Sequence, residues 1–301
     1  MKTIVRIILV LITLALFVVL AGALAFRIAN RTNGTILSGG VERAYLLYVP
    51  ESYDPSAPTP LIITIHGYAQ WPAHQMQLTR WNDLADEYGF LVVYPAGTQF
   101  PMRWRTSGAP GTETDPAIDV AFISGLIDKL EQEYNIDPNR IYANGLSNGG
   151  GMSFVLSCQH SDRIAAVGLV AGAYLTPWEA CSPTRPVPAI IFHGTEDPIV
   201  PFQGGPSRSF DLPFPVIDDW VDTLASRYGC TGALETIPAS GSASGVRFTD
   251  CAADLVYYTI EGGGHTWPGG EPLPERIAGT TTADIDATGL MWEFFQQHPL
   301  E

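Results

Sequence analysis

The chain has 301 residues, of which 46% are apolar and 16% charged, and its formal net charge is −15. This composition supplies a sizeable hydrophobic core and excludes a wholly disordered chain. Because so acidic a protein repels phosphate backbones, we expect no nucleic-acid partner. Lys2 and Lys129 are the only lysines, which leaves almost no candidate for a catalytic lysine.

The first 34 residues form a leader. Lys2 and Arg6 precede a run of apolar or small residues from Ile7 to Phe26. The segment Ala23-Leu24-Ala25 fits a signal-peptidase site, whereas the full run is long enough to span a bilayer core about 30 Å thick. A cleaved signal peptide and an uncleaved membrane anchor are therefore both open. Either one predicts an exported, secreted or periplasmic body, with possible membrane attachment through residues 7–26.

The cysteines agree with export. They are even in number and lie beyond the leader, at Cys158, Cys181, Cys230 and Cys251. Their spacing matches no zinc motif, so we expect disulfides and no metal site. Three pairings are possible, and sequence proximity favours Cys158–Cys181 and Cys230–Cys251.

After the leader, apolar runs of strand type alternate with helical patterns. In chain order, the pattern predicts a strand at 43–49 and another at 61–65, a helix at 79–88, a strand at 90–94, a helix at 115–134, a strand at 141–143, a helix at 148–158, strands at 166–170 and 189–192, a helix at 216–228, a strand at 255–260 and a helix at 283–297. The segment 239–245 is small and polar and is predicted to be a loop. Buried strands that alternate with helices indicate an α/β fold, with a mostly parallel sheet covered on both faces. We expect one domain over residues 35–301.

A strand-to-helix turn carries the first chemical motif, Gly145-Leu146-Ser147-Asn148-Gly149, which matches G-x-S-x-G. Such a turn holds its serine in a strained conformation at the carboxyl end of a strand, and glycines on both sides let strand and helix approach closely. The setting predicts that Ser147 is a nucleophile.

An activated serine needs a base, and the base needs an orienting acid. In α/β-hydrolases the chain order is serine, acid, histidine, which assigns Asp197 as the acid and His265 as the base. Glycines around His265 are expected to let its ring swing towards the serine, and His193 is expected to brace the acid loop. The substitutes for Asp197 are Glu196, Asp218 and Asp219.

The reaction also needs donors for the oxyanion. The backbone N–H of Asn148 follows the serine, and the backbone N–H of Tyr68 follows the strand at 61–65. These two amides are the predicted oxyanion hole. His66, beside Tyr68, is expected to be structural.

The set HGY, GLSNGG, HGTEDPIVP and GGGHTWPG resembles the exported poly(3-hydroxybutyrate) depolymerase/feruloyl esterase group of α/β-hydrolases, which is akin to carbohydrate esterase family 1. The resemblance covers most of the chain after about residue 35. It implies the α/β-hydrolase fold, the triad and the oxyanion hole named above, and the same two disulfide pairs. Polymer-degrading members often carry a linker and a binding domain. This sequence shows neither, so we expect inefficient attack on crystalline polymer.

Aromatic residues on the predicted strand-end loops suggest the substrate walls. We expect Trp267 and Trp104 to contact substrate, because flat aromatic faces suit a feruloyl ring, a sugar or a polyester chain. Arg103 and Arg105 lie in the loop 97–114 and could bind an acidic substrate group or pair with local acids.

Together these features predict an exported serine esterase that needs no metal or organic cofactor. Its expected partner is an ester substrate, either a phenolic or acetyl ester of a polysaccharide or a hydroxyalkanoate polyester. The same fold and triad would also serve a serine exopeptidase or an acyltransferase. A binding protein on an inactive hydrolase fold should show a broken triad, and the triad here is intact.

Overall fold

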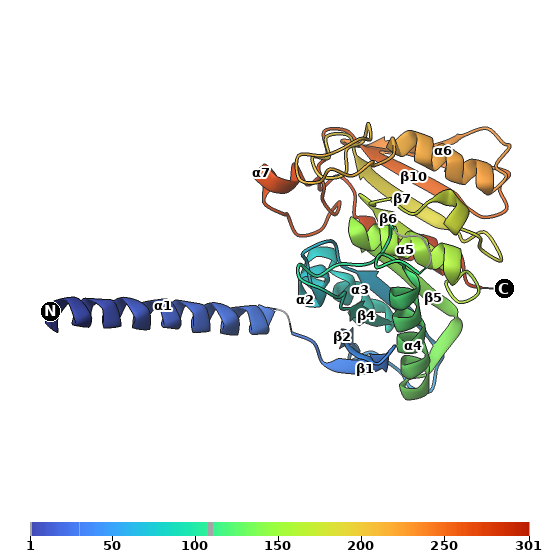
Figure 1. Ribbon diagram of the computed structural model, residues 1–301. Coiled ribbons are helices and arrows are strands. Elements are labelled where there is room, and N and C mark those ends of the chain that lie inside the picture. The colour runs from blue at the N-terminus through green and yellow to red at the C-terminus, as the bar shows by residue number, and fades with distance from the viewer. Residues whose placement is uncertain (1, 30, 108–110, 301) are drawn as a thin grey trace.

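The computed structural model describes residues 2–29, 31–107 and 111–300. A long helix, α1 (Lys2–Ala29), extends away from a body in which helices cover both sides of one large sheet (Figure 1). This arrangement confirms the predicted α/β-hydrolase architecture.

The sheet contains ten strands within the described residues, in the order β1-β2-β4-β3-β5-β6-β7-β10-β9-β8. The six central strands, from β4 to β10, are parallel to one another, and antiparallel pairs flank them on both edges. The strands are β1 (Gly34–Ser38), β2 (Val41–Tyr48), β3 (Thr59–Ile65), β4 (Leu91–Pro95), β5 (Ile136–Leu146), β6 (Ala166–Val170), β7 (Ala189–Gly194), β8 (Glu235–Ser240), β9 (Ala243–Phe248) and β10 (Leu255–Ile260).

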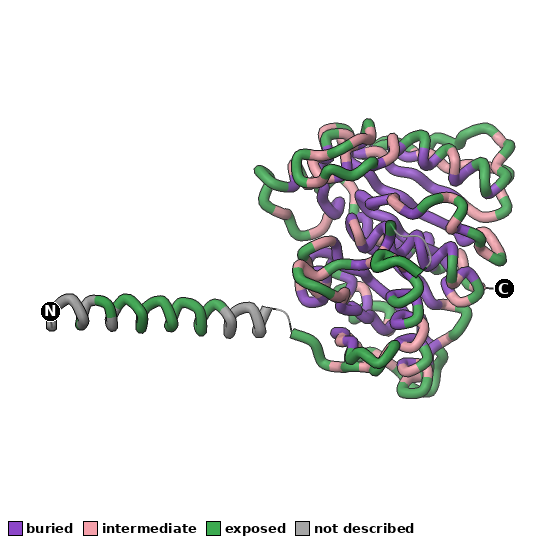
Figure 2. Tube along the Cα trace, in the orientation of Figure 1, coloured by how far each residue is buried: buried purple, intermediate pink, exposed green. Residues whose placement is uncertain are grey.

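Two hydrophobic cores lie on the two faces of the sheet. Strands β3, β4, β6 and β7 are buried at every position, as expected for strands covered on both faces (Figure 2). Along β3, Leu61 and Ile63 belong to one core and Ile62 to the other. The first core packs under α4 (Ala117–Glu133), α5 (Asn148–Gln159) and α6 (Ile217–Arg227). The second packs under α2 (Pro72–Thr79), α3 (Trp81–Tyr88) and α8 (Ala287–Gln296).

Some local predictions were wrong. The helix expected at 79–88 corresponds to α3 at 81–88, and the sequence reading missed the preceding α2, which ends where Arg80 adopts a left-handed conformation (φ 57°). The segment 239–245, expected to be a loop, instead spans the end of β8, the hairpin turn at 241–242 and the start of β9. Strand β1, the short helix α7 (Glu275–Ala278) and a 3-10 turn at Trp178–Ala180 carry no periodic pattern that the sequence reading could use.

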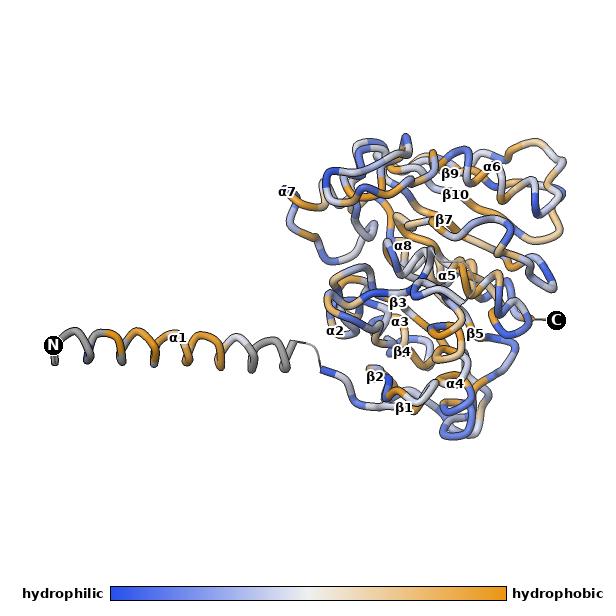
Figure 3. Tube along the Cα trace, viewed as in Figure 1, coloured by the Kyte–Doolittle hydropathy of each residue, from blue (hydrophilic) through white to orange (hydrophobic). Residues whose placement is uncertain are grey.

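The leader forms α1, whose middle section is strongly hydrophobic (Figure 3). Its described side chains, Arg6, Ile8 and residues 11–22, are exposed. Among the residues that the structure describes, no helix reaches the length and apolar character required to cross a membrane. The side chains of Ala23-Leu24-Ala25, the expected cleavage segment, lie outside the described set.

Both predicted disulfides are present. Cys158, near the end of α5, is bonded to Cys181, and Cys230, just after α6, is bonded to Cys251, just before β10. The pairing by sequence proximity is therefore confirmed.

Candidate active site

Ser147 stands between the last residue of β5 and the first residue of α5. Its backbone has φ 60° and ψ −121°, a region that non-glycine residues rarely occupy. Three backbone hydrogen bonds hold it there. Its N–H donates to the Val170 carbonyl at 2.9 Å, and its carbonyl accepts from the amides of Gly151 at 2.9 Å and Ala173 at 3.0 Å. The surrounding structure thus enforces the strained turn predicted for a nucleophile.

The two motif glycines permit this turn by leaving room for backbone. A Cβ at Gly145 would collide with the backbone of Gly149, and a Cβ at Gly149 would collide with the carbonyl of Ile65 at the end of β3. Neither neighbour is a flexible side chain that could move aside. The sequence pattern G-x-S-x-G is therefore a direct consequence of close packing between β3, β5 and α5.

His265 and Asp197 form a buried pair. They follow β10 and β7, neighbouring parallel strands, and His265 Nδ1 lies 2.7 Å from Asp197 Oδ2. The other carboxylate oxygen, Oδ1, accepts from the amides of Ile199 and Val200, both at 2.8 Å. Burial acts to raise the pKa of Asp197, but the attraction and hydrogen bond of His265, with His193 and the Val200 amide, outweigh burial and hold this pKa below its usual value. The carboxylate is therefore ionised and accepts the Nδ1–H of His265.

His193 braces the acid loop, as expected. It is fully buried on β7, and its Nε2–H donates to the Val200 carbonyl at 3.0 Å. The same Nε2 lies 3.5 Å from Asp197 Oδ2. Burial lowers the pKa of His193, which favours its neutral form. His193 therefore closes the loop that carries Asp197.

Two of the glycines before His265, Gly263 and Gly264, are closely packed. A Cβ at Gly264 would collide with the Ala278 carbonyl, and the Gly263 carbonyl accepts from the Glu196 amide at 2.9 Å. The backbone N–H of His265 also donates to the Ala278 carbonyl at 2.5 Å. These contacts fix the loop that carries His265 against α7 and against the loop that carries Asp197.

Ser147 and His265 line one pocket of about 310 Å³. Its walls are mostly apolar and come from Ile199, Phe210, Leu273, Pro274, Ile277 and Ala278. Within the described residues, Ser147 Oγ and His265 share no hydrogen bond, and catalytic hydrogen bonds often form only with substrate bound. Gly67 and Tyr68, at the carboxyl end of β3, complete the pocket. Ser147, His265 and Tyr68, the predicted nucleophile, base and oxyanion donor, therefore meet at the carboxyl ends of the parallel strands.

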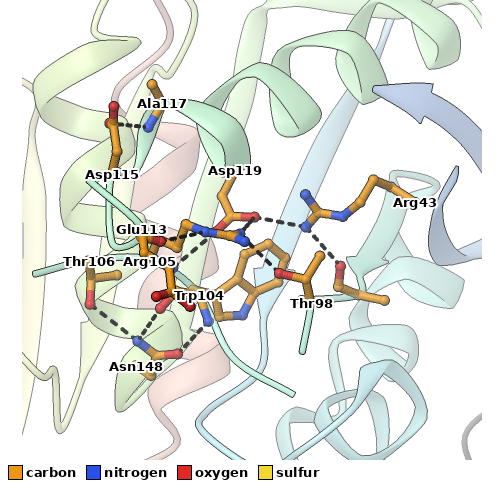
Figure 4. A network of polar contacts seen from close by, with 12 residues as sticks. Arg43, Thr98, Trp104, Arg105, Thr106, Glu113, Asp115, Ala117, Asp119 and Asn148 are labelled. Atoms are coloured by element: carbon orange, nitrogen blue, oxygen red, sulfur yellow. Dashed lines mark hydrogen bonds and ion pairs between the residues drawn. The ribbon is translucent and has the colours of Figure 1, made fainter. Parts of the chain in front are cut away.

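The amides of Tyr68 and Asn148 are both free to bind an anion. Neither amide donates to an acceptor within the described parts of the chain. The Asn148 side chain has a separate task, because it clamps the loop that follows β4. Its Oδ1 accepts from the Trp104 amide at 2.7 Å, and its Nδ2 donates to the Trp104 carbonyl at 3.1 Å and to Thr106 Oγ1 at 3.2 Å (Figure 4).

A buried ion-pair network anchors the other side of that loop. Asp119, on α4, accepts from Arg43 at 2.9 Å and from the Arg105 amide at 2.9 Å, and its side chain has no exposed surface (Figure 4). Arg105 also donates to Thr98 Oγ1 at 2.9 Å. Arg105 thus makes the local ion pair that was one of the two roles considered for it in the sequence.

Of the two aromatic residues predicted to contact substrate, Trp267 lies in the core and Trp104 lines a pocket. Trp267 has no exposed surface and donates from Nε1 to Thr288 Oγ1 at 2.9 Å, so it packs in the core and is not part of the pocket wall. Its position two residues after His265 did not reveal the direction of its side chain. Trp104 is also buried, but it lines a second pocket of about 500 Å³ together with Arg103.

Sequence reasoning missed the apolar residues that line the Ser147 pocket, among them Phe210, Leu273 and Ile277. The Phe210 ring contacts the Tyr68 ring edge to face, with centroids 5.3 Å apart. Leu273 and Ile277 lie in or near α7, in a segment otherwise rich in proline and charge. Isolated apolar residues in such a polar loop were the signal that could have indicated a pocket wall.

No cluster of three or more His, Cys, Asp or Glu side chains among the described residues is arranged to hold a metal ion.

Comparison with known proteins identifies the group. The family model described as "Esterase PHB depolymerase" matches residues 43–199, more than half of the chain. The chain belongs to the PHB depolymerase family of esterases. This membership confirms the resemblance carried by the four motifs, and the protein is a serine carboxylic ester hydrolase.

Relatives of this esterase match nearly its whole length. NocK of Nocardia uniformis subsp. tsuyamanensis, an esterase by name, is 30% identical over 88% of this chain and 83% of its own. Feruloyl esterase C of Emericella nidulans is 29% identical over 88% of this chain and 87% of its own. The structure of an acetyl xylan esterase from Aspergillus awamori superposes with a TM-score of 0.65 at 16% identity, over 87% of this chain and 98% of that one. At 16% identity, this structural similarity shows the fold alone.

Proposed function

We propose that this esterase hydrolyses carboxylic esters through Ser147, His265 and Asp197. The observation that carries the proposal is the 2.7 Å contact between His265 Nδ1 and Asp197 Oδ2, at a histidine that shares a pocket with the strained Ser147. Because Nδ1 carries the proton that Asp197 accepts, Nε2 is the unprotonated nitrogen that can serve as the base.

The reaction follows from these positions. Ser147 Oγ attacks the ester carbonyl while His265 Nε2 takes its proton and then returns it to the departing alcohol. The backbone amides of Tyr68 and Asn148 donate to the oxyanion of the tetrahedral intermediate, and losing one such donor costs about 3 kcal/mol of transition-state stabilisation. Water then attacks the acyl-enzyme by the same base catalysis and releases the acid.

The pocket chemistry suggests the acyl group. Its walls are apolar, from residues such as Phe210, Leu273 and Ile277, and its volume of about 310 Å³ suits a short aliphatic or a single aromatic acyl group. Relatives named feruloyl esterase and acetylxylan esterase support feruloyl or acetyl esters of polysaccharides as substrates. Hydroxyalkanoate esters, the substrates implied by the family description, are the second candidate class.

The two disulfides support an oxidising compartment and therefore an exported protein. The apolar run of α1, preceded by Lys2 and Arg6, supports delivery by a secretory leader.

A substrate panel with matched serine variants tests the proposal. It compares p-nitrophenyl acetate and butyrate, methyl ferulate, acetylated xylan and amorphous poly(3-hydroxybutyrate), with the wild type, Ser147→Ala and Ser226→Ala. Ser226 is an exposed serine on α6 outside the pocket, so its substitution should leave activity unchanged. Hydrolysis should vanish in Ser147→Ala alone. Activity of a folded Ser147→Ala protein equal to the wild type would contradict the proposal, and the ranking of substrates decides between the two ester classes.

A further inference from the structure

His66 is a buried histidine for which the proposed reaction has no use. It lies directly after β3, has no exposed surface, and its ring packs against Trp104 with centroids 5.2 Å apart. It immediately precedes Gly67 and Tyr68, the residues that line the pocket beside Ser147. A fully buried imidazole at this position needs a partner for each ring nitrogen.

The two ring nitrogens have partners that fix the tautomer. The Gly97 amide, just after β4, donates to His66 Nε2 at 3.0 Å, so Nε2 is the acceptor and carries no proton. The proton therefore resides on Nδ1, which donates to the Gly67 carbonyl at 2.8 Å. Burial lowers the pKa of His66 to about 4, so the ring is neutral at physiological pH. The neutral ring thus has a fixed donor at Nδ1 and a fixed acceptor at Nε2.

The Gly67 carbonyl belongs to the peptide unit that supplies the Tyr68 N–H. In a planar trans peptide the C=O and the following N–H point in opposite directions. A hydrogen bond that holds the Gly67 oxygen towards His66 therefore turns the Tyr68 N–H away from that ring. This N–H has no acceptor among the described residues, and its residue lines the pocket that contains Ser147.

Neighbouring contacts support the same peptide. The Gly67 N–H donates to Gln70 Oε1 at 2.9 Å, and the Gln70 amide donates to the Gly67 carbonyl at 3.2 Å. Trp104 Nε1 donates to the His66 carbonyl at 3.0 Å. The bond from His66 is the shorter of the two to the Gly67 oxygen, so its loss should loosen the peptide without releasing it.

We propose that His66 is a positioning residue of the oxyanion hole, whose neutral ring orients the Gly67–Tyr68 peptide so that the Tyr68 N–H faces the developing anion. This inference rests on the proposed function. It assigns His66 an effect on transition-state stabilisation rather than on substrate binding, because the oriented N–H gains its partner as negative charge develops.

Two substitutions separate the donor from the acceptor. In His66→Asn, the amide nitrogen stands as many bonds from Cβ as Nδ1 and can still donate to the Gly67 carbonyl. In His66→Gln, the amide oxygen stands as far from Cβ as Nε2 and can still accept from Gly97, but the donor to Gly67 is lost. Each variant loses one hydrogen bond of the loop, so each is the matched control of the other.

The assay measures kcat and KM for p-nitrophenyl butyrate on the full chain, with melting temperature as the measure of folding. We expect kcat of His66→Gln to fall about 10- to 100-fold with KM nearly unchanged, less than the loss on removal of a donor outright. His66→Asn should stay within about fivefold of the wild-type kcat, because it retains the donor. Equal kcat in the two variants, or a greater loss in His66→Asn, would overturn the inference.

A measurement on the wild type covers the case in which a variant does not fold. Long-range ¹H–¹⁵N NMR correlations identify the protonated nitrogen of His66, and the inference requires it to be Nδ1. A protonated Nε2 would overturn it. The two proposals fail separately: a wild type without Ser147-dependent hydrolysis overturns the proposed function and this inference with it. An active wild type with indistinguishable His66 variants overturns this inference alone.

Discussion

Replacement of the buried acid by its amide, Asp197→Asn, should abolish most activity while sparing the fold. Oδ1 of Asp197 accepts the amides of Ile199 and Val200, both at 2.8 Å, so the carbonyl oxygen of the new asparagine must take that place. Its NH₂ group then faces His265 Nδ1, where Oδ2 now lies at 2.7 Å. Two donors cannot share one hydrogen bond, so the His265 proton moves to Nε2. The ring then presents an N–H towards Ser147 and cannot remove its proton.

The expected loss in kcat is about 10⁴-fold, or about 5 kcal/mol of activation free energy. The assay is steady-state hydrolysis of p-nitrophenyl butyrate, with thermal unfolding as the measure of folding. Asp254→Asn is the matched control, because Asp254 pairs with His298 at 3.0 Å outside the pocket, and this variant should keep full activity. A folded Asp197→Asn enzyme within tenfold of the wild type would refute the assignment of the acid.

Three further predictions concern stability. His66 has a pKa of about 4 in the folded chain against an ordinary 6.5, so the unfolded chain takes up the proton first as pH falls. Between pH 6.5 and 4, His66 should contribute about 3 kcal/mol to the drop in the free energy of unfolding, measured by urea denaturation. A His66→Gln variant that shows the same drop as the wild type would contradict this. Asn148→Ala removes three hydrogen bonds to residues 104–106 and should cost about 2 kcal/mol by the same method, whereas an unchanged midpoint would show that the clamp is unimportant. The double variant Cys230→Ser/Cys251→Ser opens a loop with a sequence separation of 21 and should lower the free energy of unfolding by about 3 kcal/mol relative to the oxidised wild type. The reduced wild type also loses Cys158–Cys181 and should lose more, so a double variant as stable as the oxidised wild type would contradict this.

The sequence predicted those parts of the site in which local constraint is strongest. The strand-to-helix turn at Ser147 needs glycines on both sides because the backbones of neighbouring elements pack closely there. The G-x-S-x-G motif therefore predicts this geometry directly. Asp197 and His265 follow buried strands, and parallel topology brings such strand ends together. The same reasoning located the Tyr68 amide at the end of β3.

Side-chain direction and tertiary contacts were beyond the sequence. Trp267 lies two residues from the base, but whether a loop side chain points to solvent or to core depends on packing against α8, which no local pattern encodes. Arg80 ends α2 in a left-handed conformation without glycine or proline, so no residue type in the sequence marks this boundary. Strand β8 is largely exposed at one edge of the sheet, so it lacks the apolar alternation that marks a strand. Phe210 reaches the pocket from a long loop, a contact set by the tertiary fold.

The central claim is that Ser147 is the nucleophile and that His265 activates it. The most direct measurement is treatment of the full chain with a fluorophosphonate, followed by mass spectrometry of the peptides. The account predicts a single phosphonylated residue, Ser147, and labelling that becomes at least about 10²-fold slower in a folded His265→Ala variant because the serine loses its base. Modification at another residue, or labelling of Ser147 at the wild-type rate without His265, would contradict it.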